Sequence, residues 1–175
     1  MVTLKGESVT IRPLRSDELD LMFQGRTQLA TEALPGGGPD REQLRVRIQW
    51  SGKFHNGRID LAIEVEGRLV GDIQTYQPPN RSLPPAVYEI GIALYDPVSC
   101  GKGLGTETMQ LFVDWLFRQG AERVQGGTAV ANHPMRRVFD KLGFTVLGEL
   151  DVEGVPELLY GVTKSEWERL SDRNR

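Results

Sequence analysis

The sequence predicts a single α/β domain that takes in all of residues 1–175. Stretches in which apolar and polar residues alternate, as they do in half-buried strands, are interspersed with stretches that repeat at the helical period. A glycine-rich turn at residues 99–107 joins a strand-like run to a long amphipathic pattern. The length and the 39% hydrophobic content are those of one domain with one core.

The first half of the chain is expected to form one strand, two helices and a hairpin. Ser16 belongs to a residue type favoured as a helix cap, and a helical pattern begins at Asp17. A loop at residues 35–39 has the most flexible composition, because its glycines lie between two prolines. The hairpin turns at residues 66–68. In chain order, the expected elements are a strand at 8–14, a helix from Asp17, a helix at 40–49, and strands at 60–65 and 69–76.

The second half begins with a proline-rich loop at residues 78–85, which leads into an apolar central strand. Pro134 suits a first helical turn, where its missing N–H does no harm. Gly143 suits the left-handed residue that ends a helix. In chain order, the expected elements are a strand at 88–95, a helix at 106–119, a strand at 124–130, a helix between Pro134 and Gly143, strands at 146–152 and 155–162, and a helix at 164–172.

The turn at residues 99–107 has the chemistry of an anion site. A strand, a glycine-rich turn and a helix in succession direct several unpaired backbone N–H groups and the positive end of the helix dipole to one point. Gly101, Gly103 and Gly105 allow a ligand to approach the backbone without side-chain collision. The pattern predicts a phosphate or pyrophosphate site; the alternative is a turn that only caps a helix.

The glycine spacing separates this turn from two common phosphate loops. A Rossmann fingerprint needs a third glycine where Thr106 stands, and a Walker loop needs Ser or Thr where Gly103 follows the lysine. The remaining pattern, Gly103-x-Gly105, resembles the acyl-CoA pyrophosphate loop of the GNAT N-acetyltransferase superfamily. That loop usually opens with Gln or Arg, where this chain has Cys100.

A second segment carries the same resemblance. A strand that ends near Asn132, the helix after it, and the Lys-Leu-Gly-Phe turn at residues 141–144 all match the family's pattern. The resemblance implies the GNAT acyl-CoA N-acyltransferase fold, in which helices flank a central mixed β-sheet. Residues 9–14 and 160–167 resemble the RimJ/RimL-type branch, whose members acetylate N-terminal amines of ribosomal proteins, although many relatives take small amines.

The resemblance also implies acetyl-CoA as co-substrate and names the residues that contact it. The main chain of the central strand would bind the pantetheine arm and polarise the thioester oxygen, and the turn would hold the pyrophosphate. Asn132 matches a pantetheine contact, although asparagine there also suits a helix cap. Lys102 either pairs with a CoA phosphate or is solvated, and Cys100 is explained better as a steric replacement than as a nucleophile, because transfer in the family is direct. The expected cofactor-binding residues are Ala93, Leu94, Tyr95, Cys100, Gly101, Lys102, Gly103, Leu104, Gly105, Thr106 and Asn132.

The family's usual general acid is absent from this chain. Relatives often carry Ser and Tyr at the positions of Met135 and Phe139, and the Tyr protonates the departing thiolate. A thiol of pKa about 8.5 makes that protonation helpful rather than obligatory. Tyr160 and Tyr95 are the candidate substitutes, and each is also explained as a core or rim aromatic.

Glu89 is the expected general base. It lies on the central strand, where relatives place a carboxylate that works through water. The alternatives are a solvated edge residue or an ion-pair partner. Asp72 is the second candidate base.

Composition limits the partners. The net charge of −3 gives no polyanion footprint, so nucleic acid is not expected. No apolar run approaches the ~20 residues that cross a membrane, and the single cysteine fits a reducing cytoplasm. His55 and His133 lack companions at ligand spacing, so no metal is expected. The expected partners are acetyl-CoA and an amine acceptor, and a homodimer is left open.

The predicted function is transfer of the acetyl group of acetyl-CoA to a primary amine by direct attack in a ternary complex. The acceptor is a protein N-terminus or a small-molecule amine, and residues 33–39, 78–85 and 151–156 would wall its pocket. An acidic wall would favour a polycationic amine; the available residues are Glu32, Glu149, Asp151, Glu153 and Glu157. Because Cys100, Met135 and Phe139 depart from the family pattern, the alternative is a non-catalytic acyl-CoA-binding sensor or regulatory module.

Overall fold

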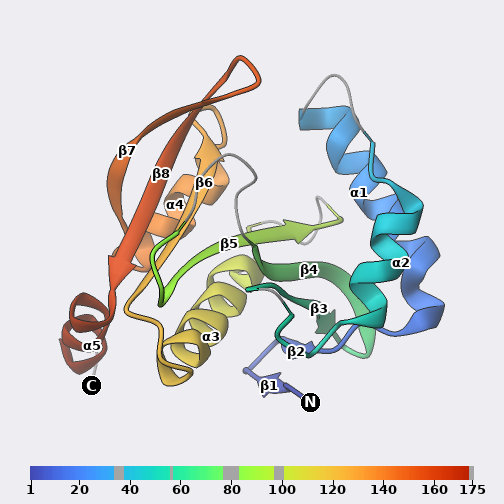
Figure 1. Cartoon of the computed structure of the whole chain (residues 1–175), viewed down its shortest axis with the longest axis horizontal. Helices are drawn as coiled ribbons and strands as arrows, with labels where there is room; N and C mark the ends of the chain where they lie inside the picture. The colour runs from blue at the N-terminus through green and yellow to red at the C-terminus, as the bar shows by residue number, and fades with distance from the viewer. Residues whose placement is uncertain (34–37, 56, 77–82, 97–100, 174–175) are drawn as a thin grey trace. The chain divides into compact units, whose positions relative to one another are not determined.

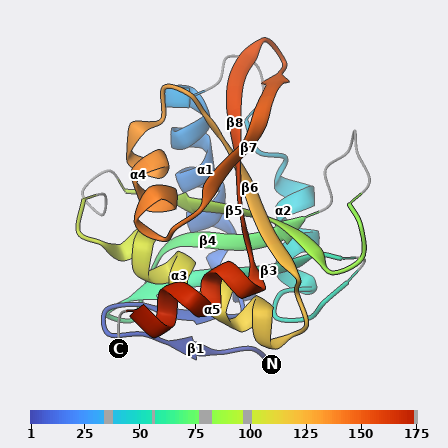
Figure 2. The same cartoon turned by 90° about the vertical axis from the view of Figure 1, so that its left-hand side faces the viewer.

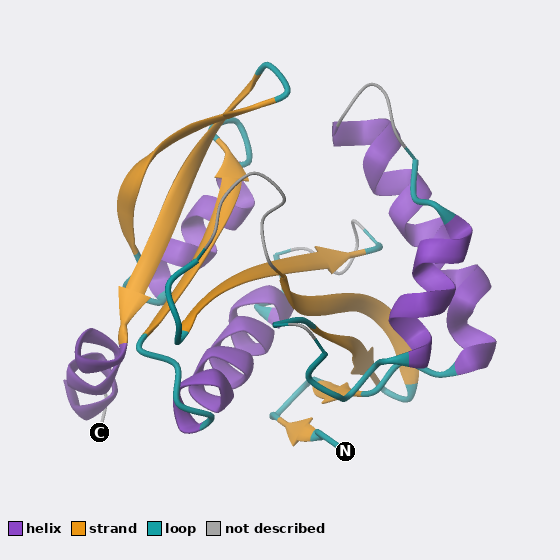
Figure 3. Cartoon of the chain, in the orientation of Figure 1, coloured by secondary structure: helices purple, strands orange, loops and turns teal. Residues whose placement is uncertain are grey.

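Eight β-strands and five α-helices make up the described part of the chain (Figures 1 and 3). This computed structural model describes residues 1–33, 38–55, 57–76, 83–96 and 101–173. The strands are β1 (Leu4–Lys5), β2 (Thr10–Arg12), β3 (Ile59–Val65), β4 (Arg68–Tyr76), β5 (Val87–Leu94), β6 (Arg123–Ala129), β7 (Thr145–Val152) and β8 (Val155–Thr163). The helices are α1 (Leu19–Ala33), α2 (Arg41–Gln49), α3 (Leu104–Arg118), α4 (His133–Lys141) and α5 (Lys164–Arg173). The predicted order of strands and helices is confirmed, and the short strand β1 is an addition to it.

The strands form one mixed sheet in the order β1-β2-β3-β4-β5-β6-β8-β7. The pairs β1–β2, β2–β3, β3–β4, β6–β8 and β7–β8 are antiparallel, whereas β5 and β6 are parallel. The parallel ladder joins residues 87–89 to residues 123–125, although β5 continues to Leu94. β6 in contrast is paired to β8 along its whole length.

The chain comprises two compact units. The first contains residues 1–75 and 92–111, and the second contains residues 76–91 and 112–175. β5 and α3 therefore contribute residues to both units. No helix of the described ranges is long and apolar enough to cross a bilayer, and no three His, Cys, Asp or Glu side chains of those ranges are grouped as metal ligands would be.

In the first unit α1 and α2 lie against each other (Figure 1). Their apolar faces bury a core cluster made of Leu14, Met22, Leu44, Ala62 and Tyr95. Burial of such side chains, at about 25 cal/mol per Å² of apolar surface, is the main stabilising contribution to this unit.

The predicted helix cap at Ser16 is wrong. Ser16 is the first residue of a short 3₁₀ turn, Ser16–Glu18, that precedes α1. The Glu18 carboxylate instead accepts a hydrogen bond from the Arg15 N–H at 2.8 Å and pairs with the buried Arg12 guanidinium. The entry to α1 is thus organised by a buried ion pair and not by a serine cap.

In the second unit the aromatic side chains of α4 and α5, Phe139 and Trp167, both contact Phe144. Trp167 of α5 donates its indole N–H to Asp114 of α3 at 2.5 Å; Figure 2 shows the ribbons of these two helices. Phe139 of α4 stacks on Tyr160 of β8 and contacts Phe144. Gly143 ends α4 with φ of +75°, as predicted for the left-handed position.

Candidate functional site

The glycine-rich turn leads directly into α3. Gly101 and Gly103 have φ of +79° and +80°, the left-handed region that glycine tolerates best. A Cβ at either position would meet no atom within 4 Å, so the space beside the turn is open. Leu104, Gly105 and Thr106 form the first turn of α3, where backbone N–H groups have no partner within the helix. The turn therefore has the donors of an anion site, and Cys100 lies outside the described residues.

Glu107 is the acidic residue of that first helical turn. Its Oε1 accepts hydrogen bonds from the N–H of Ser8 at 2.8 Å and of Val9 at 3.3 Å. These amide dipoles offset part of the negative charge, which would otherwise oppose an anion at the helix N-terminus. The exposed Lys102 adds a positive charge to the turn.

Glu89 is a buried carboxylate, with 3% of its surface exposed. Oε1 accepts from the Tyr76 hydroxyl at 3.1 Å, and Oε2 accepts from the Gln125 amide nitrogen at 3.0 Å. Both donors are neutral, and the burial overturns the alternative of a solvated edge residue. The Gln125 Oε1 atom is buried and has no hydrogen-bond partner among the described residues. An unpartnered acceptor therefore lies on the same side chain that holds the candidate base.

The end of β5 directs alternate N–H groups to its two edges. The Tyr95 N–H donates to the Val70 carbonyl of β4 at 2.9 Å. Because successive N–H groups of a strand point to opposite edges, the Leu94 N–H points away from β4. Of the predicted residues Ala93, Leu94 and Tyr95, Leu94 is thus the one whose backbone N–H is directed to the edge of β5 away from β4.

Asp72 and Tyr95 belong to a buried ionic network. The Asp72 carboxylate is fully buried and accepts from the Arg47 Nη2 atom at 2.9 Å, from two guanidinium nitrogens of Arg26 and from the Tyr95 hydroxyl. Burial alone would raise the pKa of Asp72, but the Arg26 and Arg47 charges lower it below its usual range. Burial and the Asp72 charge raise the pKa of Tyr95 above its usual value. Asp72 is therefore unsuited to act as the base, and Tyr95 is unsuited to act as the acid.

Tyr160 is the remaining candidate acid. The residue is 2% exposed, and its ring stacks on that of Phe139 at 4.7 Å between centroids. Its hydroxyl accepts from the Arg136 Nε atom at 3.3 Å, which leaves the phenolic proton for another acceptor.

The strand register places Tyr160 and Glu89 on opposite faces of the sheet. Tyr160 is opposite Gly126 of β6, so their side-chain directions share one face, the face on which Phe139 packs. Gln125 is the neighbour of Gly126 and points to the other face, where it binds Glu89. The sequence contains no motif for Gln125, Tyr76 or Arg136; only the register shows their relation to the predicted residues.

Asn132 caps α4. Its side-chain oxygen accepts from the Met135 N–H at 3.2 Å. The capping alternative is confirmed, and the two N–H donors of the exposed amide group are not used by that bond.

The acidic residues proposed for an acceptor wall do not share one face. Glu149 and Asp151 lie on one face of β7, because they are two residues apart in a strand. Glu157 is opposite Leu150, which places it on the other face. Glu153 is at the exposed hairpin turn, and the Glu32 side chain lies outside the described residues.

Comparison with known proteins adds a family and a shared fold. A family model described as an acetyltransferase (GNAT) domain matches residues 8–145. The probable N-acetyltransferase YjcK of Bacillus subtilis (strain 168) is 26% identical over 155 residues, which are 81% of this chain and 82% of that protein. The structure of the aminoglycoside acetyltransferase AAC(6')-Ib with coenzyme A has a TM-score of 0.77 at 20% identity and covers 94% of this chain and 99% of its own. Mycobacterium smegmatis RimJ in complex with CoA-disulfide has a TM-score of 0.72 at 22% identity, with 99% and 94% covered. At these identities the two structures show a shared fold.

Proposed function

Because the chain belongs to the GNAT acetyltransferase family, we propose that it moves the acetyl group of acetyl-CoA to a primary amine by direct attack in a ternary complex. The fold and the acetyltransferase class follow from the family, and they favour an enzyme over a non-catalytic sensor. The observation that carries the proposal is the buried Glu89 carboxylate on the central strand, which accepts hydrogen bonds from Tyr76 and Gln125. Asp72, the other candidate base, is instead held by Arg26 and Arg47.

The turn before α3 holds the diphosphate of acetyl-CoA. The first-turn N–H groups of Leu104, Gly105 and Thr106, with the helix dipole, supply donors and positive potential. The left-handed Gly101 and Gly103 leave room for oxygen atoms to approach. Lys102 and the amide N–H groups of Asn132 are further proposed contacts, and Cys100 and Ala93 stay in the proposed set on sequence grounds. Acetyl-CoA supplies the activated acetyl group as a thioester.

The Leu94 N–H polarises the thioester carbonyl. Its support is the strand geometry: the Tyr95 N–H is committed to Val70, whereas the Leu94 N–H is directed to the other edge. The parallel ladder of β5 ends at Glu89, five residues earlier than Leu94 (94 − 89 = 5). A backbone donor fixed before the reaction stabilises the developing oxyanion without reorganisation.

Glu89 removes the proton of the attacking amine through a water molecule. Tyr76 and Gln125 hold its two oxygens, so the carboxylate is fixed in direction. The unpartnered Oε1 of Gln125 suits a second hydrogen of that water or of the amine. Gln125 is thus a positioning residue.

Tyr160 gives a proton to the departing thiolate. The Arg136 guanidinium beside its hydroxyl would stabilise the phenolate that forms.

The acceptor is a protein N-terminus or a small-molecule amine. The sequence of residues 9–14 and 160–167 supports the RimJ/RimL-type branch, and the fold is shared with a RimJ and with an aminoglycoside acetyltransferase. We propose a single catalytic domain over residues 1–175 and a cytoplasmic setting, the latter from the single cysteine.

The test measures CoA release from acetyl-CoA with a thiol reagent, over N-terminal peptides, polyamines, aminoglycosides and amino acids. With the acceptor found, Glu89→Gln should lower kcat/KM by about 10²–10⁴-fold, the range of general base catalysis. The effect should be largest for amines of high pKa, because an α-amine of pKa about 7.7–8.0 is already largely neutral.

The matched control is Glu66→Gln, which removes an exposed carboxylate from the β3–β4 turn and should leave the rate unchanged. Binding of acetyl-CoA, measured by calorimetry, should be equal in all three proteins. A Glu89→Gln protein with the wild-type rate and pH profile would overturn the assignment of the base. Acetyl-CoA binding without CoA release for any acceptor would favour the sensor alternative.

A further inference from the structure

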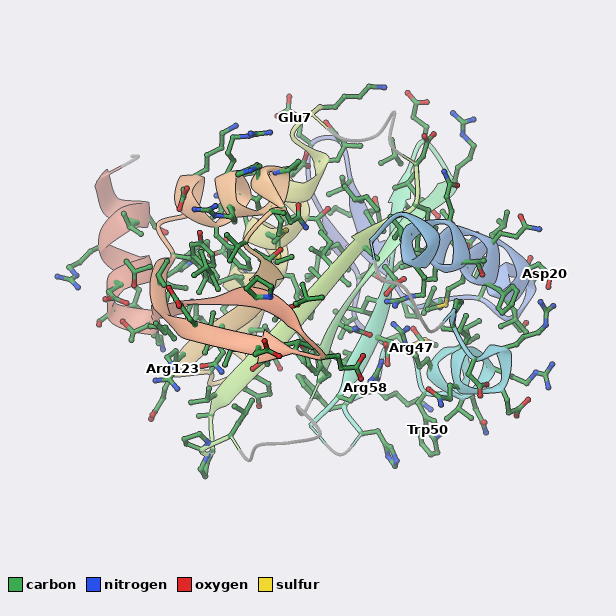
Figure 4. The ribbon with its side chains drawn as sticks, turned by 90° about the horizontal axis from the view of Figure 1, so that it is seen from above. Glu7, Asp20, Arg47, Trp50, Arg58 and Arg123 are labelled. Carbon is green, nitrogen blue, oxygen red and sulfur yellow. The ribbon has the colours of Figure 1, made fainter. Side chains whose placement is uncertain are left out.

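A small pocket at the end of α2 combines an aromatic wall with cationic side chains. Its volume is about 80 Å³, and all of its lining residues belong to the first unit. The lining residues that decide its chemistry are Arg47, Trp50, Lys53, His55, Arg58 and the Asp60 carboxylate. Figure 4 labels Arg47, Trp50 and Arg58, whose side chains lie beside α2. None of these residues has a part in the acetyl transfer proposed above.

The aromatic wall is a stacked pair of rings that stays accessible. Trp50 and His55 lie 4.3 Å apart between centroids, at an interplanar angle of 12°. Trp50 is nevertheless 42% exposed and the neighbouring Val46 is 47% exposed, whereas Trp115 and Trp167 are buried. Large apolar side chains exposed beside charged groups are typical of ligand sites.

The two arginines are fixed side by side by shared acceptors. Their Nε atoms bind the two oxygens of Asp60, Arg47 at 2.6 Å and Arg58 at 2.7 Å. Their Nη2 atoms both donate to the Gln74 side-chain oxygen, at 2.5 and 2.8 Å. The Nη1 group of each arginine has no hydrogen-bond partner among the described residues. Two guanidinium groups with fixed, unused donors are preorganised for an oxygen anion.

The charges of this network do not cancel. Its cations are Arg26, Arg47 and Arg58, and its anions are Asp60 and Asp72, which leaves one surplus positive charge. The Arg47 side chain is only 12% exposed, so water compensates that charge incompletely. An anionic group would offset this surplus, and the exposed Lys53 of the lining adds a further positive charge.

We propose that this pocket binds the carboxylate of a small molecule whose flat apolar body packs on Trp50. The Nη1 groups of Arg47 and Arg58 hold the carboxylate, and the indole ring supplies the apolar surface. The volume fits the carboxylate and the first atoms of a ring, so the rest of the ligand lies over the exposed Trp50 and Val46. The site does not depend on acetyl transfer, and its test needs no acetyl-CoA.

The test follows 4-fluorobenzoate by ¹⁹F NMR in the presence of the full chain. Saturable binding is expected, and the uncharged 4-fluorobenzamide should bind at least about tenfold more weakly, because it lacks the charge that the arginines recognise. The indole N–H signal of Trp50, assigned by its absence in Trp50→Leu, should shift with the same saturation curve. Absence of binding, or equal binding of acid and amide, would overturn the proposal.

Variants locate the site on the arginine pair. Arg58→Gln and Trp50→Leu should each weaken 4-fluorobenzoate by about tenfold or more, and Arg58→Lys should recover only part of the loss, because lysine lacks the planar fork. The control is Arg45→Gln, which removes an exposed arginine of the same helix that pairs with Glu42 outside the pocket. Unchanged affinity in Arg58→Gln, with circular dichroism showing a folded chain, would place the ligand elsewhere and refute the assignment.

Discussion

Asp72→Asn tests whether the buried network under α1 and α2 supports the first unit. Each Asp72 oxygen accepts two donors: Oδ1 binds Arg26 and Arg47, and Oδ2 binds Arg26 and Tyr95. An asparagine amide must turn its NH₂ group toward one of these donor pairs, so neither orientation satisfies the site. Breaking a buried ionic contact in this way costs about 3–5 kcal/mol. For a domain of this size, about 2–4 °C of Tm accompanies each kcal/mol, which predicts a fall of about 6–20 °C.

The assay is thermal unfolding followed by circular dichroism at pH 7. Asp20→Asn is the control, because the Asp20–Arg41 pair is exposed and should contribute less than about 1 kcal/mol. A fall in Tm of less than about 2 °C for Asp72→Asn would refute the reasoning that this carboxylate compensates two buried cations.

The pH dependence of the same pair of proteins supplies a second readout. The folded pKa of Asp72 lies below its ordinary value, so its stabilisation is complete above the unfolded pKa of about 3.9. It is lost as the pH falls through the lower folded pKa. The difference in Tm between wild type and Asp72→Asn should therefore be constant near neutral pH and shrink below about pH 4.

Two further predictions concern the proposed active site. Gly103→Ala should raise the KM for acetyl-CoA by about tenfold, because a Cβ occupies the approach to the diphosphate. Gly67→Ala is the matched control, since Gly67 has φ of +78° and the same open surroundings, and steady-state kinetics should show a normal KM despite similar strain. Tyr160→Phe should lower kcat by about tenfold or more with little change in the KM for acetyl-CoA, as expected for a lost general acid. Stopped-flow or steady-state rates that match the wild type would exclude Tyr160 as the acid.

Signals that depend on a few neighbouring residues predicted the local structure well. The Glu66–Gly67 turn was expected from a short polar break between two strand patterns, and both residues have positive φ, +50° and +78°. Gly143 likewise ends its helix as its sequence context indicated. The two-residue strand β1 was missed, because Leu4–Lys5 is too short to show an alternating pattern.

The roles of Asp72 and Glu89 depend on contacts that sequence distance hides. Both are carboxylates on strands, and the pattern treated them as competing bases. Asp72 binds Arg26 and Arg47, which are 46 and 25 residues away in the sequence. Glu89 binds Gln125, which is 36 residues away. No local signal in the sequence predicts these long-range partners. The opposite faces of Glu89 and Tyr160 follow from strand register, which the sequence also leaves undetermined.

The bond between Glu107 and the N–H groups of Ser8 and Val9 ties the beginning of the chain to the helix that follows the glycine-rich turn. Gly6 is part of that tie, since a Cβ there would collide with the Glu107 carboxylate. This contact matters for protein preparation. Extra residues from a tag or a cleavage site close to residues 6–9 would disturb the hydrogen bonds to Glu107, and its negative charge at the N-terminal end of α3 would then no longer be offset. An affinity tag after residue 175 would leave the hydrogen bonds between Glu107 and the Ser8 and Val9 N–H groups undisturbed.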